Sequence, residues 1–106
     1  MQIILDEQDV MDSVHVFIAA QGNRGVVEGS EPHHVINVEL FHNIKDGFSA
    51  KGYYYGSPHY LNQQDFIDAV ALYMSSYYSF ASDRLMISLS WDEDSELFGA
   101  DITVEK

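Results

Sequence analysis

Two segments of the chain repeat one hydrophobic pattern 56 residues apart, Leu5–Ile18 and Leu61–Met74, with five identities in fourteen positions. Apolar residues recur in both at i, i+3, i+4 and i+7, the spacing of an amphipathic helix. Asp6 and Asn62 are suitable N-caps, and each is followed three residues later by an acid that can reach back to the free amides. We therefore predict two helices, the first ending near Gly22. The expected apolar stripes are Val10, Met11, Val14, Phe17 and Ile18, then Phe66, Ile67, Val70, Tyr73, Met74 and Tyr77.

Each predicted helix is followed by the alternation of apolar and polar residues that is typical of a β-hairpin. The turns are expected at Asn43–Gly47, where Asp-Gly tolerates positive φ, and at Asp92–Glu96. A short leading strand at Gln2–Leu5 is a further candidate, and Gly22–Pro32 and Gly56–Tyr60 are expected to be loops. The alternating apolar residues are Ile36, Val38 and Leu40 in the first hairpin, Leu85, Ile87, Leu89 and Trp91 before the second turn, and Phe98, Ala100, Ile102 and Val104 in the return strand 97–106.

These elements predict one α+β domain over residues 1–106, with two layers. One antiparallel sheet of about four strands would carry both helices on one face. The order helix–hairpin–helix–hairpin divides the chain into pseudo-repeat halves at about 1–56 and 57–106. We interpret the repeat as an internal duplication. The alternative is that two unrelated helices meet the same demands of capping and amphipathicity.

Charge changes the picture most, because 17 acidic residues oppose five Lys and Arg, for a formal net charge of −12. Such a chain has few groups with which to bind phosphates, so direct binding of nucleic acid or anionic lipid is disfavoured. The same field favours a basic protein as partner, including one whose own ligand is nucleic acid. A purely solubilising role of the charge is the alternative.

Several function classes are excluded or disfavoured by what the sequence lacks. With no cysteine, disulfides, thiolate zinc sites and cysteine nucleophiles are excluded. No apolar run approaches the roughly 18 residues of a membrane span, and the acidic N-terminus is unlike a signal peptide. A soluble, cytoplasmic protein is therefore expected.

The candidate contact residues are acids and tyrosines that helix ends and ordinary core packing explain least. Acids opposite the helical stripes and acids crowded in the second turn could meet a basic partner, although a solvated turn would look the same. In an extended strand, Tyr54 would face one side and its two neighbours the other, which would expose aromatic rings as interface anchors. The candidate partner-binding residues are Asp12, Asp68, Tyr53, Tyr55, Asp92, Glu93, Asp94 and Glu96.

Catalytic and metal signatures are weak. The acidic turn has neither the length nor the flanking helices of a calcium-binding EF-hand. His33 and His34 would point to opposite sides of an extended chain, so at most one could join a metal site with His42. No G-x-S-x-G or phosphate-binding loop is present. We expect no enzyme, no cofactor and no metal ligand; a metal-dependent enzyme with His42 or His59 beside an acid is the less favoured alternative.

The opening residues, MQIILDEQDVMDSVHVFIAAQG, resemble the start of many small phage and prophage accessory proteins. Those chains begin with a short strand, an acid-capped helix and a glycine, and continue with β-hairpins. The resemblance implies a small non-enzymatic protein of the bacterial cytosol that binds and inhibits a host factor, in some cases by imitating the charge of DNA. It carries over no functional residue, because no shared motif defines one. A self-associating, homodimeric module that uses the tyrosine-bearing sheet is the main alternative.

Overall fold

The computed structural model describes residues 1–78, 80–81 and 84–105, and over these residues the chain forms two α-helices and two three-stranded antiparallel sheets. Lys106, which we expected at the end of the last strand, lies outside the described residues. The elements are β1 (Gln2–Leu5), α1 (Glu7–Gly22), the 3-10 helix η1 (Pro32–His34), β2 (Val35–Asn43), β3 (Gly47–Tyr54), β4 (Ser57–Leu61), α2 (Gln63–Tyr77), β5 (Leu85–Asp92) and β6 (Leu97–Val104).

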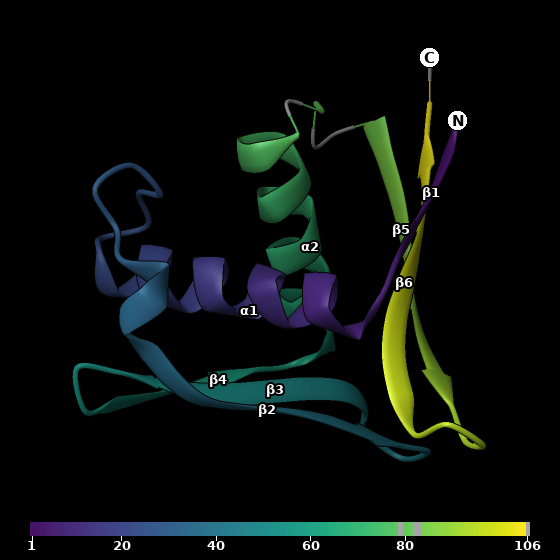
Figure 1. Ribbon diagram of the computed structural model, residues 1–106, viewed down its shortest axis with the longest axis horizontal. Helices are drawn as coiled ribbons and strands as arrows, with labels where there is room; N and C mark the ends of the chain where they lie inside the picture. The colour runs from purple at the N-terminus through teal and green to yellow at the C-terminus, as the bar shows by residue number, and fades with distance from the viewer. Residues whose placement is uncertain (79, 82–83, 106) are drawn as a thin grey trace.

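The strands are arranged in the order β1-β6-β5 in one sheet, sheet A, and β2-β3-β4 in the other, sheet B. Figure 1 shows the two sheets as the two sides of an open angle, with α1 lying across sheet B and α2 running beside sheet A. Both helices therefore lie inside the angle, and each sheet has an inner face against the helices and an outer face toward solvent.

The α+β class is confirmed, but the prediction of one sheet of about four strands with both helices on one face is wrong. The predicted leading strand is present as β1. Most of the segment Gly56–Tyr60, which we expected to be a loop, belongs to β4. Tyr55 and Gly56 take φ values of 51° and 82°, which fits a two-residue turn between β3 and β4. Pro58 is tolerated in β4 because this strand is at the edge of sheet B.

Each sheet takes strands from both halves of the chain. β1 belongs to the first half of the chain but pairs with β6 of the second half, with Leu5 opposite Ala100. β4 belongs to the second half but pairs with β3 of the first half, with Leu61 opposite Ala50. Neither sheet is therefore complete without a strand from the other half of the chain.

The two helices begin with the capping boxes that the sequence predicts. The Asp6 carboxylate accepts a 2.9 Å hydrogen bond from the backbone N–H of Asp9, and Asn62 accepts a 2.8 Å bond from that of Asp65. In both helices the backbone N–H of the cap residue in turn donates to the carboxylate of the third-position acid. These bonds satisfy amide groups that a helix start leaves without a partner. α1 ends at Gly22, as predicted.

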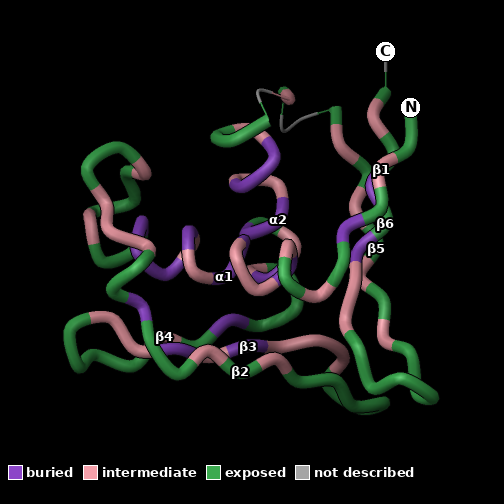
Figure 2. The backbone as a smooth tube through the Cα atoms, in the orientation of Figure 1, coloured by how far each residue is buried: buried purple, intermediate pink, exposed green. Residues whose placement is uncertain are grey.

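The core fills the angle between the sheets, where Figure 2 shows buried residues along both helices and on the middle strands. Tyr77, expected in the second stripe, is 54% exposed. No helix in the described ranges is both long and apolar enough to cross a membrane. The largest fully buried side chains are Val10, Ser13, Val14 and Ile18 of α1, Phe66, Val70 and Met74 of α2, and Leu61 and Ile102 of the sheets.

The alternation predicted for the first hairpin is interrupted in β2. The register of β2 against β3 shifts between Ile36 and Glu39, and Asn37 takes a φ of 55°. Such a bulge inserts one extra residue and reverses the faces on either side of it. Val35 is therefore buried, whereas Ile36, which we expected on the same face as Val38 and Leu40, is 56% exposed.

Candidate functional site

The predicted contact residues occupy separate places rather than one site. Asp12 lies on α1 and lines a cleft between the helices, whereas Asp68 is exposed on α2. Tyr53 lies on β3 with its side chain on the outer face of sheet B, and Tyr55 lies in the turn between β3 and β4. The four remaining acids occupy the exposed turn 92–96 between β5 and β6.

The outer face of sheet B carries apolar and aromatic side chains on both sides of the opposed pair Glu39 and Lys51. Since opposite residues of a strand pair share a face, Ile36 and Tyr53 lie together, and they lie away from the buried Ala50 and Leu61. Phe41 and Tyr60 are 39% and 69% exposed on the same face. We call Ile36, Phe41, Tyr53 and Tyr60 the outer aromatic face. Exposed apolar and aromatic groups that share one face are typical of a surface that contacts another protein.

The turn between β5 and β6 is held by its own backbone and by one of its acids. Asp92 Oδ1 accepts a 3.0 Å hydrogen bond from the backbone N–H of Asp94, and this bond lowers the pKa of the Asp92 carboxyl. The N–H of Glu96 donates to the Asp92 carbonyl at 2.7 Å. Asp92 is thus a structural member of the turn, while the side chains of Glu93 and Asp94 are exposed to solvent.

The turns of the two hairpins lie next to each other. His42 stacks on Trp91 with ring centroids 6.2 Å apart, and Phe48 meets Phe98 edge-on at 6.2 Å, so the ends of β2 and β3 contact those of β5 and β6. Phe41 of the outer aromatic face is only two residues from the first turn. We call residues 43–47 and 92–96 the acidic tip, because they hold five carboxylates and one lysine, namely Asp46, Asp92, Glu93, Asp94, Glu96 and Lys45.

The negative charge is not neutralised within the described part of the chain. Over residues 1–78, 80–81 and 84–105 the structure holds one ion pair, between His34 Nδ1 and Glu31 Oε2 at 3.0 Å. No Asp or Glu in these ranges pairs with a lysine or arginine. The carboxylates therefore remain free to attract positive charge on a partner.

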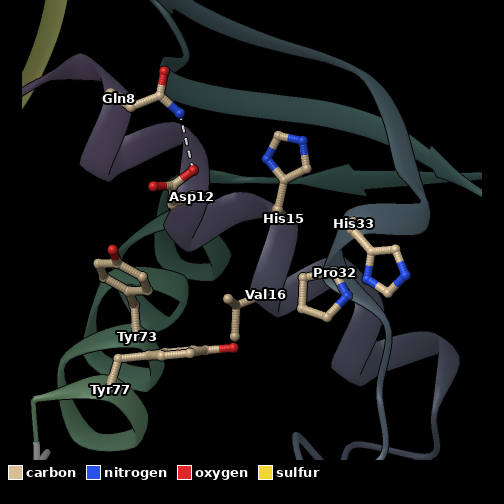
Figure 3. Close-up of a pocket in the computed structure, with 8 residues that line it drawn as sticks. All are labelled: Gln8, Asp12, His15, Val16, Pro32, His33, Tyr73 and Tyr77. Atoms are coloured by element: carbon tan, nitrogen blue, oxygen red, sulfur yellow. Dashed lines mark hydrogen bonds between the residues drawn. The ribbon is translucent and has the colours of Figure 1, made fainter.

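A cleft of about 400 Å³ lies between α1, α2 and η1 (Figure 3). On one wall Gln8 Nε2 donates to Asp12 Oδ1 at 2.9 Å, and Tyr73 and Tyr77 project from the opposite helix. Burial and the neighbouring Tyr78 hydroxyl raise the pKa of Tyr73 well above its ordinary value. Neither His42 nor His59 lines this cleft. The lining residues are Gln8, Asp12, His15, Val16, Pro32, His33, Tyr73 and Tyr77.

A second polar cluster surrounds η1 at the edge of the cleft. His33 and His34 lie on one turn of 3-10 helix and their ring centroids are 4.3 Å apart, so the extended geometry that would separate them is not present. Single ligand atoms of Glu31, His33 and His34 lie within 4.8 Å of one another. His42, the third histidine considered for a metal site, lies apart from this cluster and packs on Phe48 and Trp91.

Tyr55 contacts two residues of this cluster, Glu31 and His34. Its hydroxyl donates a 2.5 Å hydrogen bond to Glu31 Oε2, which lowers the pKa of Glu31 and raises the pKa of Tyr55 to about 12. Its ring lies edge-on to His34 at 5.1 Å. The sequence signal for this cluster is the run Glu-Pro-His-His, since proline favours the first position of a short helix and such a turn brings both histidines toward the acid.

Fold and surfaces together define a small acidic α+β protein with an exposed aromatic sheet face and a carboxylate-rich tip. The chain belongs to the family DUF2653, proteins of unknown function, whose model matches residues 1–95. The assignment agrees with the sequence resemblance in naming no characterised family. Searches of curated proteins and of solved structures gave no match.

Proposed function

We propose that this protein is a small, acidic, non-enzymatic binding protein whose partner is a basic protein. The partner would contact the outer aromatic face with apolar groups and the acidic tip with Lys and Arg. The observation that carries the proposal is the continuity of these two surfaces, since Phe41 lies two residues before the turn in which the tip begins. Apolar contacts would supply most of the affinity, and the tip would supply the rate of association and the choice of partner.

Charge favours a different, basic protein over a second copy of the chain. Two copies docked through the same face would bring together two chains that each carry a net charge of −12. Within the Debye length of about 8 Å at physiological salt, such like charges repel. A basic partner would gain from the same field, and its binding would weaken as salt is added.

The particular form that we propose is a phage-type inhibitor of a host protein that binds nucleic acid. The tip carboxylates would then stand in for phosphates, and the aromatic rings would take up apolar contacts beside them. The scarcity of Lys and Arg, five in the whole chain, fits a protein that imitates nucleic acid rather than one that binds it.

The experiment is a capture from bacterial lysate with matched surface variants. The wild-type protein is immobilised, nuclease-treated and untreated lysates are passed over it, and bound protein is eluted with a salt gradient. Tyr60→Ser tests the aromatic face, and the double variant Glu93→Gln/Asp94→Asn tests the tip. Tyr78→Ser and Glu28→Gln/Glu105→Gln are controls that remove one tyrosine ring and two carboxylates at exposed positions elsewhere.

We expect one basic protein to elute at a defined salt step, to be lost with both test variants and to be retained by both controls. Added duplex DNA should compete with the immobilised protein for the captured partner. Recovery only of the protein itself would instead indicate the homodimeric module. Equal loss with test and control variants would refute the assigned surface, because general charge would then explain the binding.

We also propose that the two halves arose by duplication, with the first strand of each half exchanged. Equivalent residues make equivalent bonds: Glu7 Oε1 accepts from Phe98 N–H at 3.2 Å, and Gln63 Oε1 accepts from Phe48 N–H at 3.1 Å. Replacing Glu7 and Gln63 by each other's residue should keep both bonds and change the free energy of unfolding by less than about 0.5 kcal/mol. Alanine at each position should cost a similar amount, about 1 kcal/mol; clearly unequal costs would count against equivalence.

A further inference from the structure

We propose that Glu31, His33 and His34 bind one divalent transition-metal ion, with Zn²⁺ as the favoured ion and one coordination position left to water or to a ligand. Two imidazoles and one carboxylate are a donor set suited to Zn²⁺, and three protein ligands with an open fourth position are typical of a site that does more than hold the fold together. The acidic tip and the outer aromatic face take no part in this site.

The positions of the donor atoms are close to what such an ion requires. Ligand atoms at 2.0–2.1 Å from a tetrahedral ion lie roughly 3.3 Å from one another. His34 Nδ1 and Glu31 Oε2 are already 3.0 Å apart, and the three ligand atoms lie within 4.8 Å of one another. Because His33 and His34 are exposed, side-chain rotation can close the remaining gap without a change in the backbone.

The backbone holds the three ligands on one turn. Pro32 occupies the first position of η1, where its fixed φ favours a helical turn, and the N–H of His34 donates to the Glu31 carbonyl at 2.9 Å. The acid and both histidines therefore come from four consecutive residues. An ion would not have to assemble them from distant parts of the chain, so little backbone conformational entropy would be lost on binding.

Tyr55 gives independent support, because it occupies a backbone conformation that tyrosine rarely adopts. Its φ is 51°, at a turn position where Asn or Gly is preferred. Residues held in such regions cluster at functional sites. Here the strained turn delivers the Tyr55 hydroxyl to the Glu31 carboxylate, as a residue that orients a metal ligand from outside the coordination sphere does.

The position of the site connects it with the cleft. His33 is both a proposed ligand and a lining residue of the cleft of about 400 Å³ between the helices (Figure 3). Gln8 and Asp12 line the opposite part of the same cleft. An ion held by His33 would therefore sit at the cleft edge, where its open position could take a small oxygen or nitrogen donor that enters the cleft.

The test is a calorimetric titration of metal-free protein with ZnCl₂ in the presence of excess Mg²⁺, which occupies weak carboxylate sites of the acidic tip. His33→Ala, His34→Ala and Glu31→Gln remove the proposed ligands. Tyr55→Phe keeps all three and removes only the hydroxyl. His42→Ala and His59→Ala are the matched controls, since they remove histidines outside the cluster. Co²⁺ absorption reports whether the bound ion is four-coordinate.

We expect one Zn²⁺ per chain, with Kd raised at least 10-fold by each ligand variant, about 10-fold by Tyr55→Phe, and unchanged by the control variants. Co²⁺ should show the intense visible bands of a tetrahedral site. The proposal is overturned if Zn²⁺ gives no saturable binding under these conditions. It is also overturned if His42→Ala or His59→Ala weakens binding as much as His33→Ala, because the ion would then be held by the general surface. Since the titration uses the isolated protein, neither result bears on the basic partner.

Discussion

Gly47→Ala should destabilise the protein through a side chain on another element. Gly47 begins β3 with a φ of 75°, a conformation that glycine adopts freely and alanine does not. A Cβ at this position would overlap the side-chain oxygen Oε1 of Gln63, and Gln63 is the first residue of α2. That oxygen accepts the 3.1 Å hydrogen bond from Phe48 N–H, which ties the start of α2 to sheet B. Alanine must therefore displace Gln63 and break the bond.

The expected cost is the sum of two effects. Forcing an alanine into the left-handed region costs about 1 kcal/mol, and loss of the hydrogen bond costs about 1 kcal/mol more. Gly56→Ala is the matched control, because Gly56 has a φ of 82° and an added Cβ would meet no atom within 4 Å. Only the strain of about 1 kcal/mol applies there. The Gly47 variant should thus lose about 1 kcal/mol more than the Gly56 variant.

Urea unfolding, followed by circular dichroism, gives both free energies, and a double-mutant cycle isolates the contact. In the Gln63→Ala background the hydrogen bond is already absent, so Gly47→Ala should cost only the strain, about 1 kcal/mol. Equal losses for Gly47→Ala and Gly56→Ala would refute the reasoning. So would strict additivity of Gly47→Ala and Gln63→Ala, because the two residues would then not interact.

Three further predictions concern single side chains. Phe66→Ala should lower the free energy of unfolding by about 3–5 kcal/mol, since Phe66 is fully buried between the sheets, and urea unfolding measures it. Asp6→Ala and Asn62→Ala should each cost about 1 kcal/mol by the same assay, and Gly at either position much less. Tyr55 should titrate near 12 by NMR, and Glu31→Gln should bring its pKa down toward the ordinary value. The pKa of Tyr55 is higher in the folded protein than in the unfolded chain. The stability that its hydrogen bond contributes is therefore fully present below the pKa of the unfolded chain, and it is lost as pH rises through about 12.

Local features of the fold were predictable from the sequence. The N-caps Asp6 and Asn62, the end of α1 at Gly22, and the turns at 43–47 and 92–96 all depend on residues within a few positions of one another. Hydrogen bonds and backbone preferences act over the same short range. Of the candidate surfaces, the acidic turn was predictable for the same reason. The extended strand that would place Tyr53 and Tyr55 on one face was not found, because β3 ends at Tyr54 and Tyr55 lies in the following turn.

The cluster of Glu31, His33 and His34 depends on a 3-10 turn that an extended segment does not have. One turn of 3-10 helix changes the side on which His33 lies, and a single bulge at Asn37 likewise moved Ile36 from the core to the outer face. Successive side chains of a strand point to opposite faces of the sheet, so one inserted residue moves every later side chain to the other face. A change of one residue in local conformation thus changes which side chains contact one another.

The sequence by itself determined that the chain forms capped amphipathic helices and alternating strands and carries a charge of −12, because these depend on composition and short-range chemistry. Tertiary structure alone decided that the strands divide into two sheets, that β1 and β4 cross to the opposite halves, and that two hairpin turns meet to form the acidic tip. Strand pairing is non-local: the same alternating strand satisfies its hydrogen bonds beside several partners. The choice among them is made by the total burial that the whole chain achieves.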